Sequence, residues 1–223
     1  MSWISRSSRP HDGLFNFEKG DRMNIVFIHG HRATAHSFNY LSRSLRGHAH
    51  IFLEYDSAKG FYANHHDMLQ RLERVDDIFF VAHSLGGIHA LHLTDKLQSR
   101  ILGAVTISTP YGGSEAAAVL SYMMPFNRVL QDIHPRAAPI VKSERFALPG
   151  VWTNIVSVIG HSPLMLAAND GVVTLASMRK RDDIRLIEVA SNHYEVLMHE
   201  ATVAAIQSSI REIEHGRFQR VGS

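Results

Sequence analysis

The sequence predicts an α/β fold in which helices cover both faces of one mostly parallel sheet. Several short runs of β-branched and other apolar residues are apolar at every position, a pattern typical of strands buried on both faces. These runs alternate with segments of helical spacing, and neither an internal repeat nor a low-complexity linker interrupts them. The 223 residues suffice for one large core and are too few for two ordinary domains. We therefore expect a single domain over residues 23–223, preceded by an N-terminal extension of residues 1–22.

Six strands are expected, and the first of them, Asn24–Ile28, has a regular β-branched pattern. The predicted strand ranges are 24–28, 50–54, 78–82, 101–108, 151–159 and 184–189. Helices are expected at 35–45, 65–74, 85–98 and 194–214. In the first of these, Phe38, Leu41 and Leu45 recur on one helical face. Parallel strands joined in this way need right-handed crossovers, which bring helices to both faces of the sheet.

Composition excludes several classes of function. The net charge of +2 is a near balance, and the richest basic run, residues 179–181, is followed at once by Asp182 and Asp183, so nucleic-acid binding is not expected. The absence of cysteine excludes disulfides, thiolate zinc sites and a cysteine nucleophile. No run approaches the roughly 20 apolar residues of a transmembrane helix. No signal-peptide core stands out either, so we expect a cytoplasmic protein.

The sixteen histidines invite a metal hypothesis. The best candidates are the run 65–67, His-His-Asp, and the pair His89 and His92, which share a helix face. No carboxylate or third histidine at a fixed spacing completes a ligand set in either place. We therefore expect histidines on the surface or at the edge of the core, no metal site and no cofactor.

The stretch Val81–Gly87 carries the main chemical signal. A buried apolar strand leads into Ser84, and a segment of helical spacing follows, so Ser84 is expected on a sharp strand-to-helix turn. Such a turn leaves room only for small neighbours, here Ala82 and Gly86, and lifts the hydroxyl above the sheet edge. The stretch resembles the nucleophile elbow of the α/β-hydrolase family, with Ala82 replacing the first glycine of G-x-S-x-G, as it does in some lipases. The alternative is a helix start without chemistry.

A serine nucleophile needs a base, and the base needs a carboxylate that fixes its tautomer. In this fold the order along the chain is serine, acid, histidine, each just beyond the carboxyl end of a strand. Asp170 follows the predicted strand 151–159 and His193 follows 184–189, so we predict the triad Ser84, Asp170 and His193. The weaker alternatives are two acids that precede a strand and two histidines that break the chain order or lie within a helix: Asp182, Asp183, His161 and His199.

The oxyanion formed by attack on an ester needs preorganised amide donors. The backbone N–H of Leu85, directly after the nucleophile, is one. The second is expected from the loop after the first strand, where Gly30 lets the backbone approach the site. A His-Gly pair ahead of this donor resembles lipases, and the resemblance assigns the role to the His31 amide, with Arg32 next in line.

The family resemblance covers about residues 24–215. Beside the elbow, it rests on the pair 29–30, the stretches 108–114 and 169–173, and the pair 192–193, which together look like bacterial triacylglycerol lipases and lipase-like deacylases. The resemblance implies a shortened fold that lacks the first two strands, so the six predicted strands should lie in the order 2-1-3-4-5-6. The sequence itself contains no lipase-type calcium site, and we predict none.

Residues 111–150 break the alternation and lie where this fold inserts a lid. Five of the seven prolines fall between Pro110 and Pro149. Met123, Met124 and Phe126 within this insertion suit loose contacts with apolar substrates, so we predict them as substrate-binding residues. The alternative is an ordinary long excursion that packs its own apolar side.

These observations predict a serine hydrolase that cleaves carboxylic esters, of lipids or other acyl compounds, through an acyl-enzyme. A thioesterase or acyltransferase with the same triad remains an alternative, since only the leaving group and acceptor differ. A binding protein that kept the fold without turnover is the alternative from another class. The predicted partner is a small-molecule ester or lipid, and the oligomeric state stays open.

Overall fold

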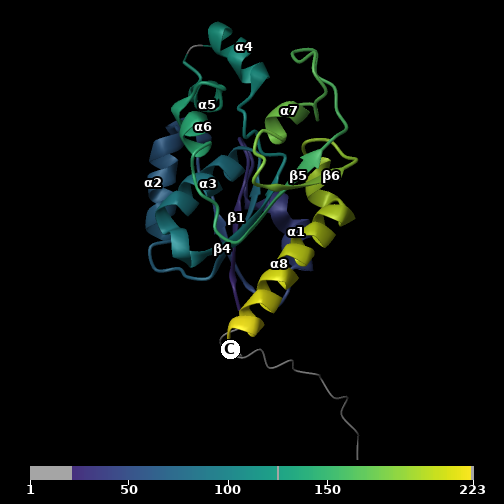
Figure 1. The fold of residues 1–223 in the computed structure, drawn as a ribbon. Helices are drawn as coiled ribbons and strands as arrows, with labels where there is room; N and C mark the ends of the chain where they lie inside the picture. Colours follow the sequence, from purple (N-terminus) through teal and green to yellow (C-terminus); the bar gives the residue numbers. More distant parts are fainter. Residues whose placement is uncertain (1–21, 125, 222–223) are drawn as a thin grey trace, which may run out of the picture.

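The computed structural model of the protein describes residues 22–124 and 126–221, and the predicted extension 1–22 lies outside them except for Arg22. Six parallel strands form one sheet, in the order β2-β1-β3-β4-β5-β6 (Figure 1). This confirms the predicted fold class and strand order. The strands are β1 (Asn24–Ile28), β2 (Ala49–Leu53), β3 (Ile78–His83), β4 (Ile101–Ile107), β5 (Val151–Ser157) and β6 (Arg185–Val189).

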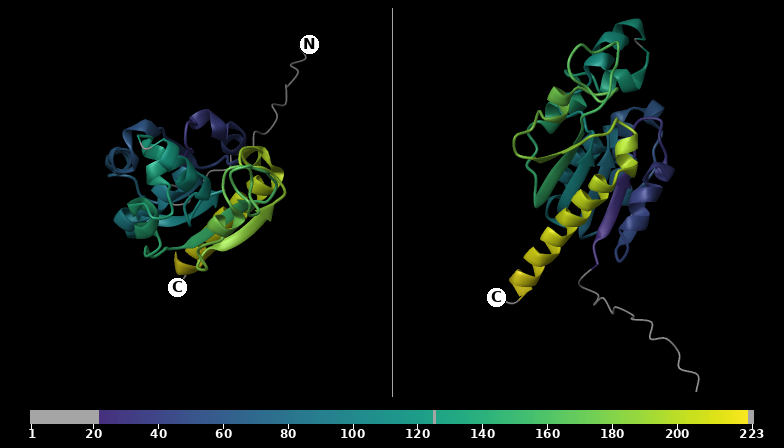
Figure 2. Two further views of the ribbon diagram at one scale, coloured as in Figure 1. Left: turned by 90° about the horizontal axis from the view of Figure 1, so that it is seen from above. Right: turned by 90° about the vertical axis from the view of Figure 1, so that its right-hand side faces the viewer.

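Both faces of the sheet are buried, which is why the central strands are apolar at every position. In β1, Val26 packs with the helices α2 (Phe61–Arg71), α3 (Leu85–Leu97) and α6 (Ala138–Ser143). Its neighbour Phe27 points to the other face and packs with α1 (Asn39–Ser44) and α8 (Glu200–Val221). Figures 1 and 2 show α8 along the side of the sheet away from α2 and α3.

Most of the predicted strands and helices end or begin one or more residues from where they were expected. β5 ends at Ser157 and not at residue 159, because the chain leaves the sheet and Ile159 is exposed. β2 spans Ala49–Leu53. The helix predicted at 65–74 is α2, which begins at Phe61. The Phe61 N–H donates to the carboxylate of Asp132, 2.8 Å away and 71 residues further along the chain. Because the acceptor for this first backbone N–H of the helix comes from a distant part of the chain, the sequence near Phe61 contains no sign that a helix begins there.

The helix predicted at 194–214 is two elements, the 3-10 turn η4 (Glu195–Met198) and α8. The break is at His199, whose backbone is extended and whose Nδ1 accepts a hydrogen bond from the Ala201 N–H. The side chain thus satisfies one of the free amides of the new helix start. The segment predicted at 35–45 is likewise a 3-10 turn, η1 (Ala35–Phe38), followed by α1.

Three short helices fill the predicted insertion between β4 and β5: α4 (Glu115–Met123), α5 (Arg128–Asp132) and α6. Val129 of α5 and Ile140 of α6 are buried in the core that also contains α2 and α3. The latter part of the insertion is therefore integral to the body, whereas α4 stands out beyond the carboxyl ends of the strands (Figures 1 and 2). A role for α4 as a lid stays a prediction. Among the described residues, no helix combines the length and apolarity needed to cross a bilayer.

The histidines singled out in the sequence gather around α3. His89 is fully buried and stacks on Phe61, with ring centroids 4.1 Å apart, while His65 and His92 lie 5.6 Å from each other. Within the described part of the chain, neither ring nitrogen of His89 has a hydrogen-bond partner, and no three potential metal ligands come together. Burial lowers the pKa of His89 well below its ordinary value and that of His65 to about 4.

Buried histidines with lowered pKa values make the protein sensitive to acid. Below about pH 6.5 an unfolded histidine takes up a proton that folded His89 does not, so stability falls as the pH falls. We expect His89→Phe to reduce the slope of unfolding free energy between about pH 6 and 5 by up to about 1.4 kcal/mol per pH unit. Denaturant titrations across this range measure the slope. Leu91→Met, a buried substitution on the same helix without a titratable group, is the control, and an unchanged slope in His89→Phe would contradict the argument.

Candidate active site

Ser84 lies on a strained turn between β3 and α3. Its backbone has φ 53° and ψ −123°, a conformation that costs a non-glycine residue about 1–3 kcal/mol. The turn is held by the Ser84 N–H, which donates to the carbonyl of Ile107 at 2.8 Å, and by the Gly87 N–H, which donates to the Ser84 carbonyl at 2.9 Å. This is the strand-to-helix geometry that the sequence predicts.

The end of β1 packs directly against this turn. A Cβ atom on Gly86 would lie 2.2 Å from the carbonyl oxygen of Ile28, so only glycine fits there. A Cβ on Gly30 would lie 2.9 Å from Nδ1 of His83 and 3.1 Å from the Cβ of Ser84. The absence of side chains at Gly30 and Gly86 thus brings the loop after β1 beside the serine.

His193 connects Ser84 with Asp170. Its Nε2 is 3.1 Å from the Ser84 hydroxyl, and its Nδ1 is 2.7 Å from Oδ2 of Asp170. Since an ionised carboxylate only accepts, Nδ1 carries the proton and Nε2 is free to accept one. The two loops are also joined through the backbone, because the His193 N–H donates to the Asp170 carbonyl at 3.1 Å.

Asp170 is almost completely buried, yet it is well supplied with donors. Oδ1 accepts from the N–H groups of Val172 and Val173 at 3.0 and 2.8 Å, and Oδ2 accepts from the Ser157 hydroxyl at 2.5 Å. Burial alone would raise the pKa of Asp170. The hydrogen bonds and the attraction of His193 outweigh it and lower the pKa below its ordinary value. The carboxylate is therefore ionised at neutral pH.

The sequence analysis missed two residues around this group. Ser157 is the last residue of β5, and its hydroxyl also lies 2.7 Å from that of Ser108. His83 precedes the serine, and its Nε2 lies 2.8 Å from the carbonyl oxygen of His193. Burial lowers the pKa of His83 to about 3, so the ring is neutral and donates from Nε2. A histidine at the end of the otherwise apolar strand β3 was the available signal for His83. Ser157 had no such signal, because β5 also contains Thr153 and Asn154.

The two predicted amide donors lie on either side of the serine. Leu85 is the first residue of α3, where a backbone N–H has no acceptor within the helix. His31 lies within a turn closed by a hydrogen bond of 3.3 Å from the Ala33 N–H to the Gly30 carbonyl. The Nδ1 of His31 is 2.8 Å from the Ser57 hydroxyl, so its side chain is engaged elsewhere. Arg32, the alternative donor, follows with a φ of 53°.

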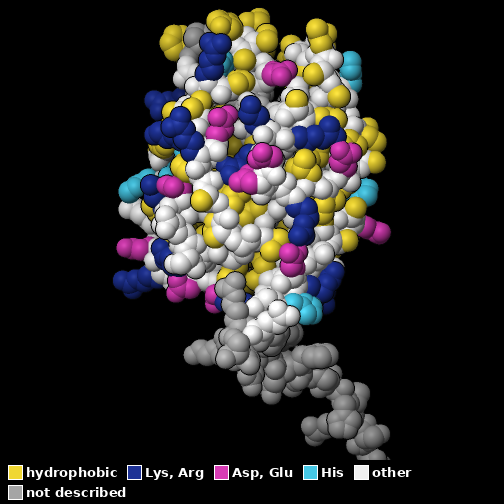
Figure 3. Space-filling view, in the orientation of Figure 1, with side chains coloured by type: hydrophobic (Ala, Val, Ile, Leu, Met, Phe, Trp, Pro, Cys, Tyr) yellow, Lys and Arg dark blue, Asp and Glu magenta, His cyan; other side chains and the backbone are white. Residues whose placement is uncertain are grey.

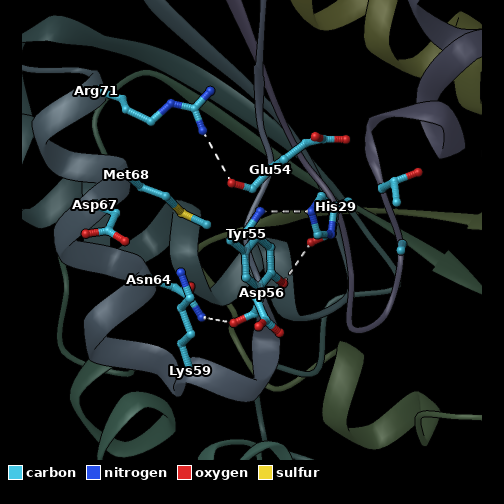
Figure 4. A pocket seen from close by; sticks show the side chains of 11 residues that line it. His29, Glu54, Tyr55, Asp56, Lys59, Asn64, Asp67, Met68 and Arg71 are labelled. Atoms are coloured by element: carbon cyan, nitrogen blue, oxygen red, sulfur yellow. Dashed lines mark hydrogen bonds between the residues drawn. The ribbon is translucent and has the colours of Figure 1, made fainter.

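His29 fixes this loop to the end of β2 (Figure 4). The Tyr55 N–H donates to Nε2 of His29 at 3.2 Å, and the Tyr55 hydroxyl donates to the His29 carbonyl at 2.9 Å. The two rings stack with centroids 4.4 Å apart. Both residues line a hollow of about 470 Å³ beside α2, where Arg71 donates to the carbonyls of Phe52 and Glu54. The hydrogen bonds of His29, Tyr55 and Arg71 therefore hold the ends of β1, β2 and α2 together.

A separate cavity of about 130 Å³ lies over Ser84. It is mostly apolar, and its walls come from the loops after five of the strands. The lining residues are His31, Ala33, Ser37, His83, Ser84, Leu85, Pro110, Ser114, Ile133, Val172, Val173, His193, Tyr194 and Leu197. Serine, histidine and both predicted amide donors thus share one cavity.

The structure is similar to solved structures of several hydrolases. The mature lipase of Bacillus licheniformis matches with a TM-score of 0.65 at 14% identity, over 87% of this chain and 94% of that one. A metagenomic carboxyl esterase matches with a TM-score of 0.68 at 16% identity, over 88% of this chain and 77% of that one. An extracellular α/β-hydrolase from a Paenibacillus species matches with a TM-score of 0.53 at 16% identity, over 82% of this chain and 96% of that one. The chain has the α/β-hydrolase fold. No protein-family model matches the sequence. No curated protein matches it either.

Within this α/β-hydrolase fold, the structure does not bring every predicted residue to the cavity. Met123, Met124 and Phe126 are 75%, 52% and 96% exposed and are not among the residues that line it. Apolar side chains at the top of Figure 3 mark this exposed region over α4. Their role in substrate binding stays a prediction. The residues of the insertion that do line the cavity are Ser114 and Ile133, together with Pro110 directly before it.

The alternative acids and bases lie outside the cavity. Asp183 pairs with Arg181, which donates to its carboxylate at 2.8 and 2.5 Å. Asp182, His161 and His199 are exposed. None of these four residues is among those that line the cavity over Ser84.

The support of Asp170 by Ser157 is open to test. Ser157→Ala removes one donor to the carboxylate, so we expect the pKa of Asp170 to rise. A pH titration of the carboxyl carbon by NMR measures it. Ser108→Ala is the matched control, because Ser108 contacts Ser157 but not Asp170, and its effect is expected to be smaller. Equal pKa values in Ser157→Ala and the unaltered protein would show that the backbone amides suffice.

Proposed function

We propose that the protein is a carboxylic ester hydrolase in which Ser84, His193 and Asp170 form a catalytic triad. The observation that carries the proposal is the single imidazole within hydrogen-bond reach of both the Ser84 hydroxyl and a buried, ionised carboxylate. In this role Asp170 orients His193 and balances the imidazolium, while Ser84 is the nucleophile. The similarity to a lipase and a carboxyl esterase supports the same class of reaction.

The proposed reaction has two halves. Ser84 Oγ attacks the ester carbonyl carbon while His193 Nε2 takes the hydroxyl proton. The resulting tetrahedral intermediate collapses when the bond from carbon to the leaving oxygen breaks, and that oxygen leaves as an alcohol with the proton from His193. Water then attacks the acyl-enzyme with His193 as base, which releases the carboxylic acid and restores the serine.

The negative charge of the tetrahedral intermediate is assigned to the backbone amides of Leu85 and His31. Loss of one such donor typically costs about 3–4 kcal/mol of transition-state stabilisation. Both residues line the cavity over Ser84, and neither role involves a side chain. The packing of β1 against Gly86 supports this assignment, because it fixes the distance between the two loops.

A fluorophosphonate probe tests the nucleophile. We expect it to label the protein at Ser84, and Ser84→Ala to abolish labelling. His193→Gln should slow labelling by about a hundredfold or more, because the general base is lost. Mass spectrometry locates the adduct. Ser37→Ala, at another serine of the same cavity, serves as the control. Labelling that persists in Ser84→Ala would contradict the assignment.

The small cavity predicts a preference for short acyl groups. At about 130 Å³ it is below the range of roughly 300–1,000 Å³ typical of ligand pockets. Each methylene that finds no room loses about 0.8 kcal/mol of burial, close to fourfold in kcat/KM. We expect p-nitrophenyl acetate and butyrate to be better substrates than the dodecanoate, and Ile133→Ala to move the optimum toward longer chains. An optimum at long chains in the unaltered protein would contradict this interpretation.

The same panel decides two points left by the sequence. The first is whether the protein is an esterase or a thioesterase. The ratio of kcat/KM for an ester to kcat/KM for the thioester of the same acyl group distinguishes the two. Alanine substitutions at Met123, Met124 and Phe126 test the predicted substrate contacts, and a shift of the chain-length optimum in these variants would support them. Val119→Ala, another exposed apolar position on α4, is the control for altered surface polarity.

A further inference from the structure

A second groove, of about 660 Å³, runs along the surface between α1 and η4. The two elements pack against each other on the face of the sheet that α8 covers (Figure 1). Three of its apolar side chains, Tyr40, Tyr194 and Met198, are 39%, 64% and 62% exposed. The lining residues are His36, Ser37, Asn39, Tyr40, Arg43, Ser44, Tyr194, Leu197 and Met198.

This groove adjoins the cavity over Ser84. Ser37, Tyr194 and Leu197 line both spaces. The groove therefore borders the Ser84 cavity on the side of η4, whereas Val172, Val173 and Ile133 line the cavity alone. The hollow beside α2 shares Ala33 with the cavity and is lined mainly by polar groups already bonded to one another.

The chemistry of the proposed reaction decides which part of the substrate takes this path. The leaving oxygen must come within reach of Nε2 of His193, which gives it a proton. Tyr194, Leu197 and Met198, which closely follow His193 in the chain, form one wall of the groove. The alcohol portion of the ester thus begins at the mouth of this groove, and the acyl portion lies in the cavity on the other side of Ser84.

The charged residues that line the groove indicate which class of alcohol would bind there. Arg43 lines it, and no carboxylate is among the described residues that do. Arg43 is exposed, so its guanidinium remains hydrated, and an ion pair there has a modest effect on affinity. The exposed surfaces of Tyr40, Tyr194 and Met198, which line the same groove as Arg43, suit an apolar chain.

We propose that the groove between α1 and η4 binds the leaving alcohol, and that it favours an alcohol with an apolar chain and an anionic end that pairs with Arg43. The inference rests on the proposed ester hydrolysis, because that reaction decides that the alcohol, and not the acyl group, extends from Ser84 toward the groove. It assigns a substrate class, esters of anionic long-chain alcohols, to a surface outside the catalytic cavity.

Acetyl esters of ω-hydroxydodecanoate and of its neutral amide test the proposal in kinetics. Arg43→Ala is expected to raise KM for the anionic ester about three- to fivefold more than KM for the amide. Arg43→Lys keeps the charge and is expected to restore most of the difference. Arg74→Ala, an exposed arginine outside the groove, is the matched control and should leave both KM values unchanged.

A binding measurement separates the groove from catalysis. In Ser84→Ala, calorimetric titration with ω-hydroxydodecanoate is expected to show binding that is tighter than that of ω-hydroxyhexanoate and is weakened three- to fivefold by adding Arg43→Ala. Binding that is absent, or is unaffected by Arg43→Ala, would overturn the proposal even if the esterase is active. If the protein hydrolyses no ester and resists the fluorophosphonate, the proposed function fails, and this titration still decides whether the groove binds the alcohol.

Discussion

The close contact between the end of β1 and the first turn of α3 is the constraint on which the site depends. Gly86 lies so near the Ile28 carbonyl that the backbones touch, and a methyl group would push them apart. The contact fixes the position of α3 relative to β1, so that Ser84 faces the loop after β1. It also keeps the positive φ of Ser84 in place, because the hydrogen bond to Ile107 fixes the other side of the turn. One packing contact thus sets the relation of the serine hydroxyl to two backbone amides.

The other half of the site is held mainly by main-chain hydrogen bonds. The carboxylate of Asp170 receives two amides of its own loop, and its carbonyl receives the His193 N–H. The Ile159 N–H donates to the Ser191 carbonyl at 3.1 Å, which joins the same two loops nearer the sheet. Because the loops after β5 and β6 are connected at both levels, the imidazole and the carboxylate move as one unit. Ser157 and His83 add the side-chain donors that complete this arrangement.

The parts of the molecule that could be predicted from sequence are those with short-range signals. Apolar strands, the turn around Ser84 and the positions of Asp170 and His193 just beyond strand ends all depend on local patterns and on the rule that parallel strands end at a common edge. The start of α2 could not be predicted, because it depends on Asp132. The contact between Ser157 and Asp170 likewise arises only when the loop folds back on its strand. Three short helices lie between β4 and β5, and which residues of this segment reach the cavity is set by tertiary packing.

That packing divides the insertion into two parts with different properties. Tyr111, at its start, is buried with its hydroxyl 2.6 Å from that of Thr106, and the Gly112 N–H donates to the carbonyl of Ser177 at 3.1 Å. The Ser114 N–H in turn donates to the carbonyl of Ile133 at 2.7 Å, which joins the two walls of the cavity that the insertion supplies. Between these fixed points the chain makes an excursion through α4, whose apolar side chains face outward. The wall of the cavity is therefore anchored to the sheet independently of α4. The predicted lid role of α4 is therefore compatible with a cavity wall that is held at Ser114 and Ile133.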